Sequence, residues 1–407
     1  MKRFSWLRTV LIAVALTVMM AAPSFAVETL TGTLTYGGQS YTVTGYWKSN
    51  AKQTKVKFVT SSVVKKGWLQ LGGYTYYLKG KGKRVTGVVY ISGRYYYFDN
   101  EGKQRTGLIN TGDATYYFDP AEHGARAVGA GERVIDGNTY VFNALGQVLI
   151  NAFDDSGNFY DAKGQRIHKA TIKRLIQVAL QPVGSTMYVW GGGWNQTYDG
   201  SGIESTTIGV PSRWAIFFRS QTKDYNYQNT RYQVHDGLDC AGYIGWALYN
   251  TFNIESGHGG YVMLAQTMAS TYAGWGWGTY KAAASVNDYK CGDIMSYSGG
   301  HVYIVLGSCK DGSVVLLHAS PKGVMISGTY SRSGSKDSEA IALAKKYMSE
   351  CYPEWYAKYP DLERGTSYLT SYSQMRWTLG GTKSVMTDPD GYTSMGPEQI
   401  LYDLFKK

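Results

Sequence analysis

The sequence predicts a multi-domain protein in which an N-terminal all-β solenoid of hairpin repeats precedes a C-terminal α+β domain. Three observations carry this prediction. A period of twenty residues runs through the chain after residue 66. Near Lys169 the apolar residues change to helical spacing, which ends at Pro182. Beyond a second helical stretch, apolar runs have the length of strands.

Length and composition exclude several classes of protein. The 407 residues suffice for roughly two or three domains, and 17% charged residues are too few for a disordered polyelectrolyte. The 50 Gly and 36 Tyr fit short strands and turns better than long helices. Apolar runs stay below the length of about eighteen residues that a membrane helix needs, so no membrane span is expected.

Residues 1–26 have the pattern of a signal peptide, which predicts a secreted protein. Lys2, Arg3 and Arg8 precede a short apolar stretch at 10–22, and small residues stand at Ser24 and Ala26. The 4 Cys of the chain are too few for a disulfide scaffold. Because neither Cys-x-x-Cys nor closely spaced His pairs occur, no metal site and no cofactor are expected.

Residues 27–66 form a basic segment with strand-like alternation. Between Glu28 and Asp99 the chain has eleven Lys or Arg and no acidic residue. Alternating Thr runs at 30–35 and 41–46 predict a hairpin. A basic block of this kind indicates an anionic partner, and a solvated basic face is the alternative. The cations before the repeats are Lys48, Lys52, Lys55, Lys57, Lys65 and Lys66.

The repeats occupy residues 67–168. Tyr pairs recur at steps of twenty residues, and Thr-Gly pairs keep the same register. Each unit has an aromatic strand, a Gly-bearing turn and a second short strand, which is the pattern of a β-hairpin. A fixed period of this size predicts a solenoid whose units bury their faces against their neighbours. The recurring aromatic residues are Trp68, Tyr76, Tyr77, Tyr96, Tyr97, Tyr116 and Tyr117.

Over roughly 67–166 these units resemble the cell-wall-binding repeats of the choline-binding and glucan-binding type. The resemblance implies that the recurring aromatic residues bind a wall polymer. Choline-binding members form aromatic cages for a quaternary ammonium, but here only Trp68 stands in the Trp position. The pattern therefore disfavours choline and favours a carbohydrate or a teichoic-acid-like polymer. Because alternate strand residues face opposite sides, at least one Tyr of each pair is expected in the core.

The C-terminal half carries a candidate nucleophile at the start of a helix. Apolar positions 240, 244, 247 and 248 share one helical face, which places Cys240 in the first turn. The helix dipole and free backbone N–H groups there favour a thiolate, a better nucleophile than a thiol. Asp239, directly before it, is expected to cap the helix or to help position a substrate.

Two histidines are placed to complete such a site. The apolar run at 302–306 reads as a strand that opens on His301, and the run at 314–319 reads as a strand that includes His318. If these strands pair antiparallel, both imidazoles approach the start of the helix. His301 would then be the base and His318 the residue that orients it. The alternative for His318 is an ordinary core residue.

Over roughly 170–330 the chain resembles the NlpC-type cell-wall cysteine peptidases, a papain-like family. Tyr188-Val-Trp-Gly-Gly, Asp239-Cys240-Ala241-Gly242, Gly292-Asp293-Ile294 and His301-Val302-Tyr303-Ile304 match in the family's order. The resemblance implies a papain-like α+β domain over 169–407, with its catalytic helix packed on an antiparallel sheet. It also implies Cys240, His301 and His318 as catalytic residues and Tyr188 at the border of the cleft, where Tyr188 and Asp239 are expected to bind substrate.

Two stretches depart from the family pattern. An insertion at 195–236 contains an apolar run around Trp214, which predicts an ordered lid or cleft wall. An extension at 331–407 is expected to contain a helix near 338–351. Trp275 and Trp277 either line the cleft or lie in the core, and His258 is expected on the surface. Cys291 and Cys309 bracket the His301 strand, so a disulfide between them is possible.

Together the two resemblances imply a secreted, wall-associated hydrolase of a Gram-positive bacterium. Its expected substrate is the stem peptide of peptidoglycan, cleaved at the γ-D-glutamyl–diamino acid bond, and no nucleic-acid partner is expected. One alternative keeps the chemistry and moves the bond, as in an N-acetylmuramoyl-L-alanine amidase of the CHAP-like type. The other is a non-enzymatic wall-binding or glucan-binding adhesin.

Overall fold

The computed structural model describes residues 28–52, 55–195, 200–231 and 234–406. The expected signal peptide at 1–26, and parts of the insertion at 196–199 and 232–233, lie outside the described residues. The chain divides into two compact units: residues up to Gly107 with Phe118–Arg126, and Leu108–Tyr117 with Ala127–Lys407. In the described ranges, no helix combines the length and the apolar character needed to cross a membrane.

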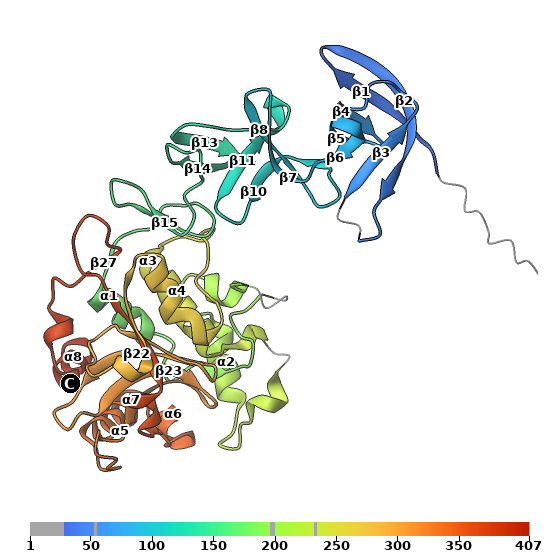
Figure 1. The fold of residues 1–407 in the computed structure, drawn as a ribbon. Helices are drawn as coiled ribbons and strands as arrows, with labels where there is room; N and C mark the ends of the chain where they lie inside the picture. Colours follow the sequence, from blue (N-terminus) through green and yellow to red (C-terminus); the bar gives the residue numbers. More distant parts are fainter. Residues whose placement is uncertain (1–27, 53–54, 196–199, 232–233, 407) are drawn as a thin grey trace, which may run out of the picture. The chain divides into compact units, whose positions relative to one another are not determined.

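The first unit opens with a closed β-barrel (Figure 1). Its strands are joined in the order β1-β2-β3-β6-β5-β4. They are β1 (Leu30–Tyr36), β2 (Gln39–Ser49), β3 (Val56–Thr60), β4 (Gly67–Leu71), β5 (Tyr74–Lys79) and β6 (Lys83–Arg84). Alternate residues point inward, and the buried apolar ones make the core: Leu34, Val43, Phe58, Leu69, Leu71, Tyr76 and Leu78.

This barrel corrects the expected boundary between the basic segment and the first repeat at residue 67. The segment 27–66 supplies β1–β3 and the first repeat supplies β4–β6, because β1 pairs with β4 and β3 pairs with β6. Three strands alone would leave two unpaired edges, and the first repeat hairpin closes them. The expected hairpin within the basic segment is confirmed, since β1 and β2 pair antiparallel around Gly37 and Gly38.

Hairpins follow at the positions of the later repeats. In the first unit, β7 (Gly87–Ile91), β8 (Arg94–Phe98) and β9 (Gln104–Arg105) form one sheet, and β12 (Ala125–Arg126) also belongs to this unit. β10 (Gly107–Asn110) and β11 (Thr115–Asp119) each contain a border between the units. In the second unit, β13 (Gly131–Ile135) pairs with β14 (Asn138–Phe142), and β15 (Ala152–Phe153) pairs with β16 (Phe159–Tyr160).

The last hairpin shares its core with the α+β part of the second unit. The buried Asp161 carboxylate accepts a hydrogen bond from the Gly259 N–H at 2.8 Å and lies 3.1 Å from Nδ1 of His258. Phe159 packs edge-on against Trp277, with ring centroids 5.2 Å apart. His258 was expected on the surface, but it is buried as the partner of a buried carboxylate. The expected domain boundary at 168/169 therefore does not separate two cores.

The centre of the second unit is a sheet in the order β20-β26-β21-β22-β23-β24-β25. Neighbouring strands pair antiparallel except β24 and β25, which are parallel. The strands are β20 (Gly278–Lys281), β21 (Ile294–Tyr297), β22 (His301–Ser308), β23 (Val314–Ser320), β24 (Gly323–Thr329), β25 (Glu363–Arg364) and β26 (Tyr372–Trp377). Two short parallel pairs accompany it: β17 (Ala170–Thr171) with β27 (Met386–Thr387), and β18 (Met187–Tyr188) with β19 (Gly237–Leu238).

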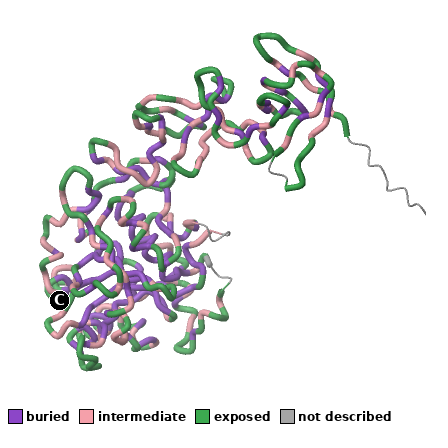
Figure 2. Tube along the Cα trace, viewed as in Figure 1, coloured by how far each residue is buried: buried purple, intermediate pink, exposed green. Residues whose placement is uncertain are grey.

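The helix α3 (Cys240–Phe252) packs on β22 and β23 and is buried along its whole length. Figure 2 shows the buried, purple segments gathered inside the α+β part of the second unit. The helix expected near 338–351 is confirmed as α5 (Glu339–Cys351), capped by Ser338. The insertion contributes α2 (Ser212–Ser220), whose Trp214 is buried. The remaining helices are α1 (Ile172–Leu180), α4 (Met268–Gly274), α6 (Pro353–Lys358), α7 (Ser367–Thr370) and α8 (Pro397–Phe405).

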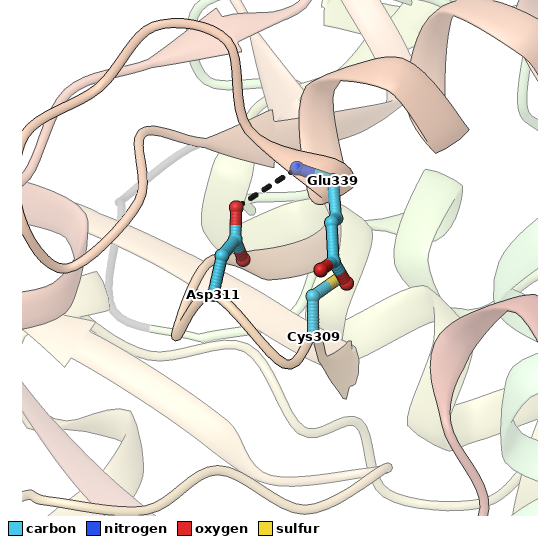
Figure 3. A group of neighbouring side chains, drawn as sticks. All are labelled: Cys309, Asp311 and Glu339. Atoms are coloured by element: carbon cyan, nitrogen blue, oxygen red, sulfur yellow. Dashed lines mark hydrogen bonds between the residues drawn. The ribbon is translucent and has the colours of Figure 1, made fainter.

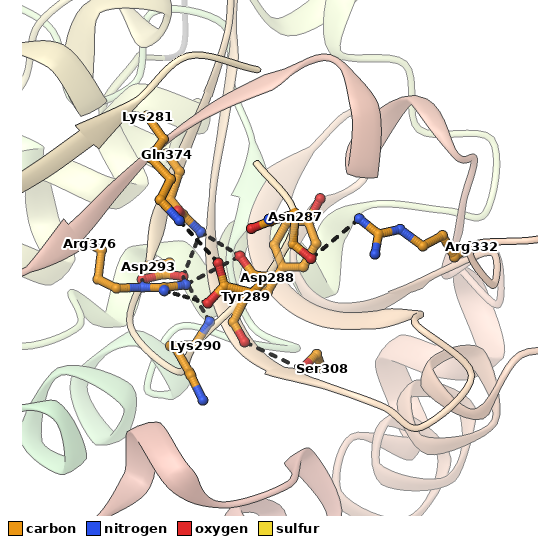
Figure 4. A network of polar contacts seen from close by, with 10 residues as sticks. All are labelled: Lys281, Asn287, Asp288, Tyr289, Lys290, Asp293, Ser308, Arg332, Gln374 and Arg376. Atoms are coloured by element: carbon orange, nitrogen blue, oxygen red, sulfur yellow. Dashed lines mark hydrogen bonds and ion pairs between the residues drawn. The ribbon is translucent and has the colours of Figure 1, made fainter. Parts of the chain in front are cut away.

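The Gly292-Asp293 motif lies in a polar network between β21 and β26 (Figure 4). Asp293 is 1% exposed and accepts hydrogen bonds from Arg376 Nη2 at 2.7 Å and Gln374 Nε2 at 2.8 Å. Arg376 Nη1 also bonds Asp288 at 2.6 Å. Asp293 therefore has a structural role. It holds the loop before β21 to β26, which lies about eighty positions later in the chain.

Candidate active site

Cys240 is the first residue of α3, as the apolar spacing predicted. Asp239 is the N-cap: one carboxylate oxygen accepts from the Gly242 N–H at 2.7 Å and the other from the Gly191 N–H at 3.2 Å. Burial raises the pKa of this carboxyl to about 7. Because backbone donors occupy both oxygens, Asp239 joins the helix start to the turn after β18.

Glycines allow that turn to lie directly on the helix. A Cβ added to Gly242 would lie 2.0 Å from the Gly192 carbonyl oxygen, and one added to Gly193 would lie 2.5 Å from Gly242 Cα. Gly193 also has a φ of 95°, which favours glycine. The Gly-Gly turn after Tyr188 and the Asp239-Cys240-Ala241-Gly242 motif therefore meet in one close backbone contact, which positions Cys240.

The sulfur of Cys240 lies against the backbone on both sides of His301. Sγ is 3.7 Å from the Gly300 carbonyl oxygen, and the Val302 N–H stabilises the charged form of the thiol. Burial, and then the Asp239 charge, nevertheless raise the pKa of Cys240. Burial therefore opposes the thiolate that the helix start was expected to favour.

His301 and His318 meet across neighbouring antiparallel strands, as predicted. His301 is the first residue of β22, and its Nε2 lies 2.9 Å from Nδ1 of His318 on β23. His318 is fully buried, and its Nε2 lies 3.0 Å from Ser327 Oγ on β24. Since His318 occupies Nε2 of His301, any proton exchange with Cys240 would have to use Nδ1.

Both imidazoles are held in an environment that disfavours a positive charge. Burial, and then the charge of Arg364, lower the pKa of His301 to about 3, and the same causes lower the pKa of His318. A lone thiolate and a lone imidazolium are thus both disfavoured. Proton transfer from Cys240 to His301 creates the two charges together, so each compensates for the other.

A cavity of about 210 Å³ borders Cys240. It is lined by Tyr188, Trp190, Gly191, Trp194, Asp239, Cys240, Ala241, Leu264, Ala265, Gln266 and Gly300. Tyr188 is therefore at the cleft, as expected from the resemblance. Its ring lies 5.2 Å from that of Tyr227, and its carbonyl accepts a bond from Tyr225 at 2.6 Å. The insertion thus supports one wall of the cleft, whereas Trp277 lies in the core.

Sequence reasoning missed the part of the site that the C-terminal extension supplies. Arg364 Nε donates to His318 Nε2 at 3.3 Å. The ring of Tyr368 lies 5.7 Å from that of His301 and 6.0 Å from that of His318, and Tyr372 lies 6.3 Å from His301. No motif marks these residues, because the extension lies outside the stretch that resembles the peptidase family.

The predicted wall-binding aromatic residues are mostly packed inward. Tyr76 and Tyr116 are each 7% exposed, which confirms a core Tyr in two of the three pairs and removes both as free ligand platforms. Trp68 packs against Tyr77 and Tyr96, at 5.1 and 4.8 Å. Tyr97 lies against Phe118, and Tyr117 packs partly buried against the core of Ile135, Phe142 and Val148.

Other aromatic residues of the same hairpins face outward. Tyr90 is 61% exposed and Tyr95 is 39% exposed, and their rings lie 4.9 Å apart. Tyr95 stands one position before the predicted pair, on the strand face opposite Phe98, which is fully buried. Because side chains alternate between the two faces of a strand, the apolar Phe98 in the sequence could have identified the core-facing side of β8.

Cys309, Asp311 and Glu339 bring a thiol and two carboxylates within 4.8 Å of one another (Figure 3). Asp311 accepts bonds from the Glu339 N–H and from Ser313, and Glu339 accepts one from the Lys310 N–H. These bonds explain the cluster as the start of α5 held to a turn. Cys291 and Cys309, both within the described residues, are not joined by a disulfide.

No protein-family model matches the chain, and no curated protein matches it. Solved structures do match. CbpJ from Streptococcus pneumoniae TIGR4 is 24% identical over 35% of this chain and 53% of that chain, with a TM-score of 0.26. Choline binding protein F from Streptococcus pneumoniae, with a peptidoglycan analogue, is 23% identical over 33% and 43%, with a TM-score of 0.25. A pneumococcal cell wall endolysin from phage Cp-1, complexed with choline, is 23% identical over 30% and 37%, with a TM-score of 0.21.

These three structures are two choline-binding proteins and a cell wall endolysin. This chain spans about half of the first of them and less than half of the others. The three matches cover 35%, 33% and 30% of this chain, and they say nothing of Cys240, His301 and His318.

Proposed function

We propose that this chain is an exported cell-wall hydrolase that cleaves stem peptides with a cysteine nucleophile. The observations that carry the proposal are the contact of Cys240 with the Gly300 carbonyl directly before His301, the bonded pair His301–His318, and the cavity that Cys240 borders. A thiol at a helix start, an imidazole and a third residue that orients the imidazole are the parts that acyl transfer requires. The cavity gives a substrate carbonyl access to the sulfur.

The reaction follows from these positions. Sγ of Cys240 attacks the carbonyl carbon while its proton passes to Nδ1 of His301. The Cys240 backbone N–H stabilises the oxyanion. The C–N bond breaks as His301 returns the proton to the leaving amine, and a thioester remains. Water then attacks the thioester through His301, which releases the carboxylic acid and the thiol.

The bond we expect to be cleaved is the γ-D-glutamyl–diamino acid bond, by resemblance to the NlpC-type peptidases. Mass spectrometry of fragments released from purified walls by the mature chain tests this. The expected product has a new amine on the diamino acid. A new amine on the alanine next to muramic acid would establish the amidase instead. If the chain binds walls but releases no fragment, the hydrolase function fails and the non-enzymatic adhesin is supported.

The barrel offers a site for an anionic wall polymer. A cavity of about 350 Å³ is lined by Tyr36, Val63, Val64, Lys65, Lys66, Gly80 and Lys81. Lys66 Nζ stands 4.5 Å from the centre of the Tyr36 ring. Lys81 has a φ of 64°, an unusual conformation for a residue with a side chain. Three cations at one cavity, in a barrel whose strands carry no acidic residue, favour a polymer of phosphodiesters.

Replacing Lys65, Lys66 and Lys81 together by Gln is expected to weaken binding of purified poly(glycerol phosphate) roughly tenfold at 0.1 M salt, because three charges leave one cavity. At 1 M salt, where screening acts over about 3 Å, the difference should disappear. Titration of the fluorescence of the mature chain measures both. Lys48, Lys55 and Lys57 are exposed barrel residues outside the cavity, so their triple Gln variant is the matched control. Equal losses in the two variants would contradict a local site.

A further inference from the structure

We propose that Arg364 is a positioning residue of the candidate active site, which fixes the nitrogen of His318 that carries the proton and opposes protonation of His301. The inference rests on the proposed cysteine chemistry and adds a residue that neither family motif contains. It also gives the C-terminal extension a role, which is to set the proton arrangement in the pair of histidines.

Arg364 is held firmly against His318. It lies on β25, which pairs with β24 at the edge of the sheet, and its side chain is 11% exposed. Nε donates to Nε2 of His318 at 3.3 Å, Nη1 donates to the Glu363 carbonyl at 2.6 Å, and Nη2 lies 3.3 Å from Met325 Sδ. All three nitrogens therefore have a neighbour, and the guanidinium cannot turn away without losing them.

The direction of these hydrogen bonds determines the tautomers. A guanidinium only donates, so Nε2 of His318 must accept the bond from Arg364. The proton of neutral His318 is then on Nδ1, where it is donated to Nε2 of His301 across 2.9 Å. Neutral His301 consequently carries its own proton on Nδ1, the nitrogen that has to receive the thiol proton. In this arrangement His301 offers no lone pair to Cys240.

The reactive arrangement needs the opposite order of protons. Before His301 can take the proton of Cys240, its Nδ1 must be free and its own proton must be on Nε2, from which it is donated to Nδ1 of His318. His318 must then carry its proton on Nε2, facing the Arg364 donor. Ser327 Oγ, 3.0 Å from that nitrogen, can accept the hydrogen bond of the relocated Nε2–H, because a hydroxyl both donates and accepts. Arg364 therefore favours the resting arrangement, and Ser327 makes the reactive one possible.

Among the charged and titratable groups described around His301 and His318, Arg364 is the cation whose charge opposes their protonation. Tyr368 on α7 and Tyr372 on β26 present rings whose burial raises their pKa values, so they stay neutral. Asp239 acts on Cys240 from the start of α3. Asp361 lies 3.7 Å from Nη1 of Arg364, but its side chain is 85% exposed and water screens its charge.

The test is the pH dependence of Cys240 alkylation by iodoacetamide in the mature chain, followed at the Cys240 peptide by mass spectrometry. Arg364→Met removes the charge and the donor, Arg364→Gln keeps a donor without charge, and Arg364→Lys keeps a charge. We expect the Met variant to be alkylated roughly tenfold faster than the wild type at pH 6, which corresponds to a rise of about one unit in the pKa of His301. The Gln variant should lie between them and the Lys variant should shift least.

Arg332→Gln is the matched control, because Arg332 makes a long bond to the Asn287 carbonyl and does not touch either histidine. Melting temperatures identify any variant that fails to fold, in which case the Gln and Lys variants carry the comparison. Profiles that coincide within twofold in folded Met, Gln and wild-type chains would overturn the role of Arg364. If the profiles separate as expected but no wall fragment is released, the role of Arg364 stands and the proposed hydrolase function fails.

Discussion

Replacing Cys240 by Ala is expected to abolish the release of wall fragments, with a loss of at least about 10⁴-fold in rate. The reason is that Sγ is the atom that forms the thioester, and no other cysteine of the chain is among the residues that line the cavity. Release of new amines from purified walls, measured with an amine-reactive dye, gives the rate. Cys240→Ser should lose almost as much, because a serine hydroxyl gives up its proton far less readily than a thiol.

The matched control for Cys240 is Cys351→Ser, at the C-terminal end of α5 and outside the cavity. Its rate should equal that of the wild type. Wall binding should persist in the Cys240 variants, since the barrel and the hairpins of the first unit do not include Cys240. Fragment release by Cys240→Ala at a rate near that of the wild type would exclude Cys240 as the nucleophile.

The local parts of the site were predictable because each depends on a short stretch of sequence. Helical spacing placed Cys240 at the start of α3, and two apolar runs placed His301 and His318 on strands. That these strands pair was an inference from resemblance and chain order, and the pairing is observed. The Asp239 cap was likewise predictable, because Asp is one of the residues preferred at the N-cap position of a helix.

The rest depends on contacts between distant segments, which local patterns do not encode. Arg364 reaches His318 only because β25 joins the sheet edge forty-six positions later in the chain. His258 is buried because Asp161, ninety-seven positions earlier, needs a partner. The barrel joins segments that differ in composition, so a boundary drawn from composition fell inside it. The raised pKa of Cys240 follows from burial, which sequence around a helix start does not reveal.

Replacing His301 by Gln is expected to lower the rate of wall hydrolysis about 10³-fold with little change in KM, because the base that takes the thiol proton and protonates the leaving amine is lost. Alkylation of Cys240 should move to higher pH, above the ordinary thiol range of about 8.5, since the buried thiol no longer has a proton acceptor. His123→Gln, in a turn of the repeats, is the control and should leave both measurements unchanged.

Stability against acid gives an independent measurement on His301, without substrate. Its pKa is about 3 in the folded chain, against about 6.5 for an ordinary histidine, so the unfolded chain takes up this proton first as the pH falls. The free energy of unfolding of the wild type should therefore decrease from about pH 6.5 toward pH 3. His301→Gln removes one titrating group and should lose less stability over that window, while His318 still contributes its share. Urea unfolding at pH 7, 5 and 4 measures the difference, and parallel losses in wild type and variant would show that His301 is not held neutral by burial and Arg364.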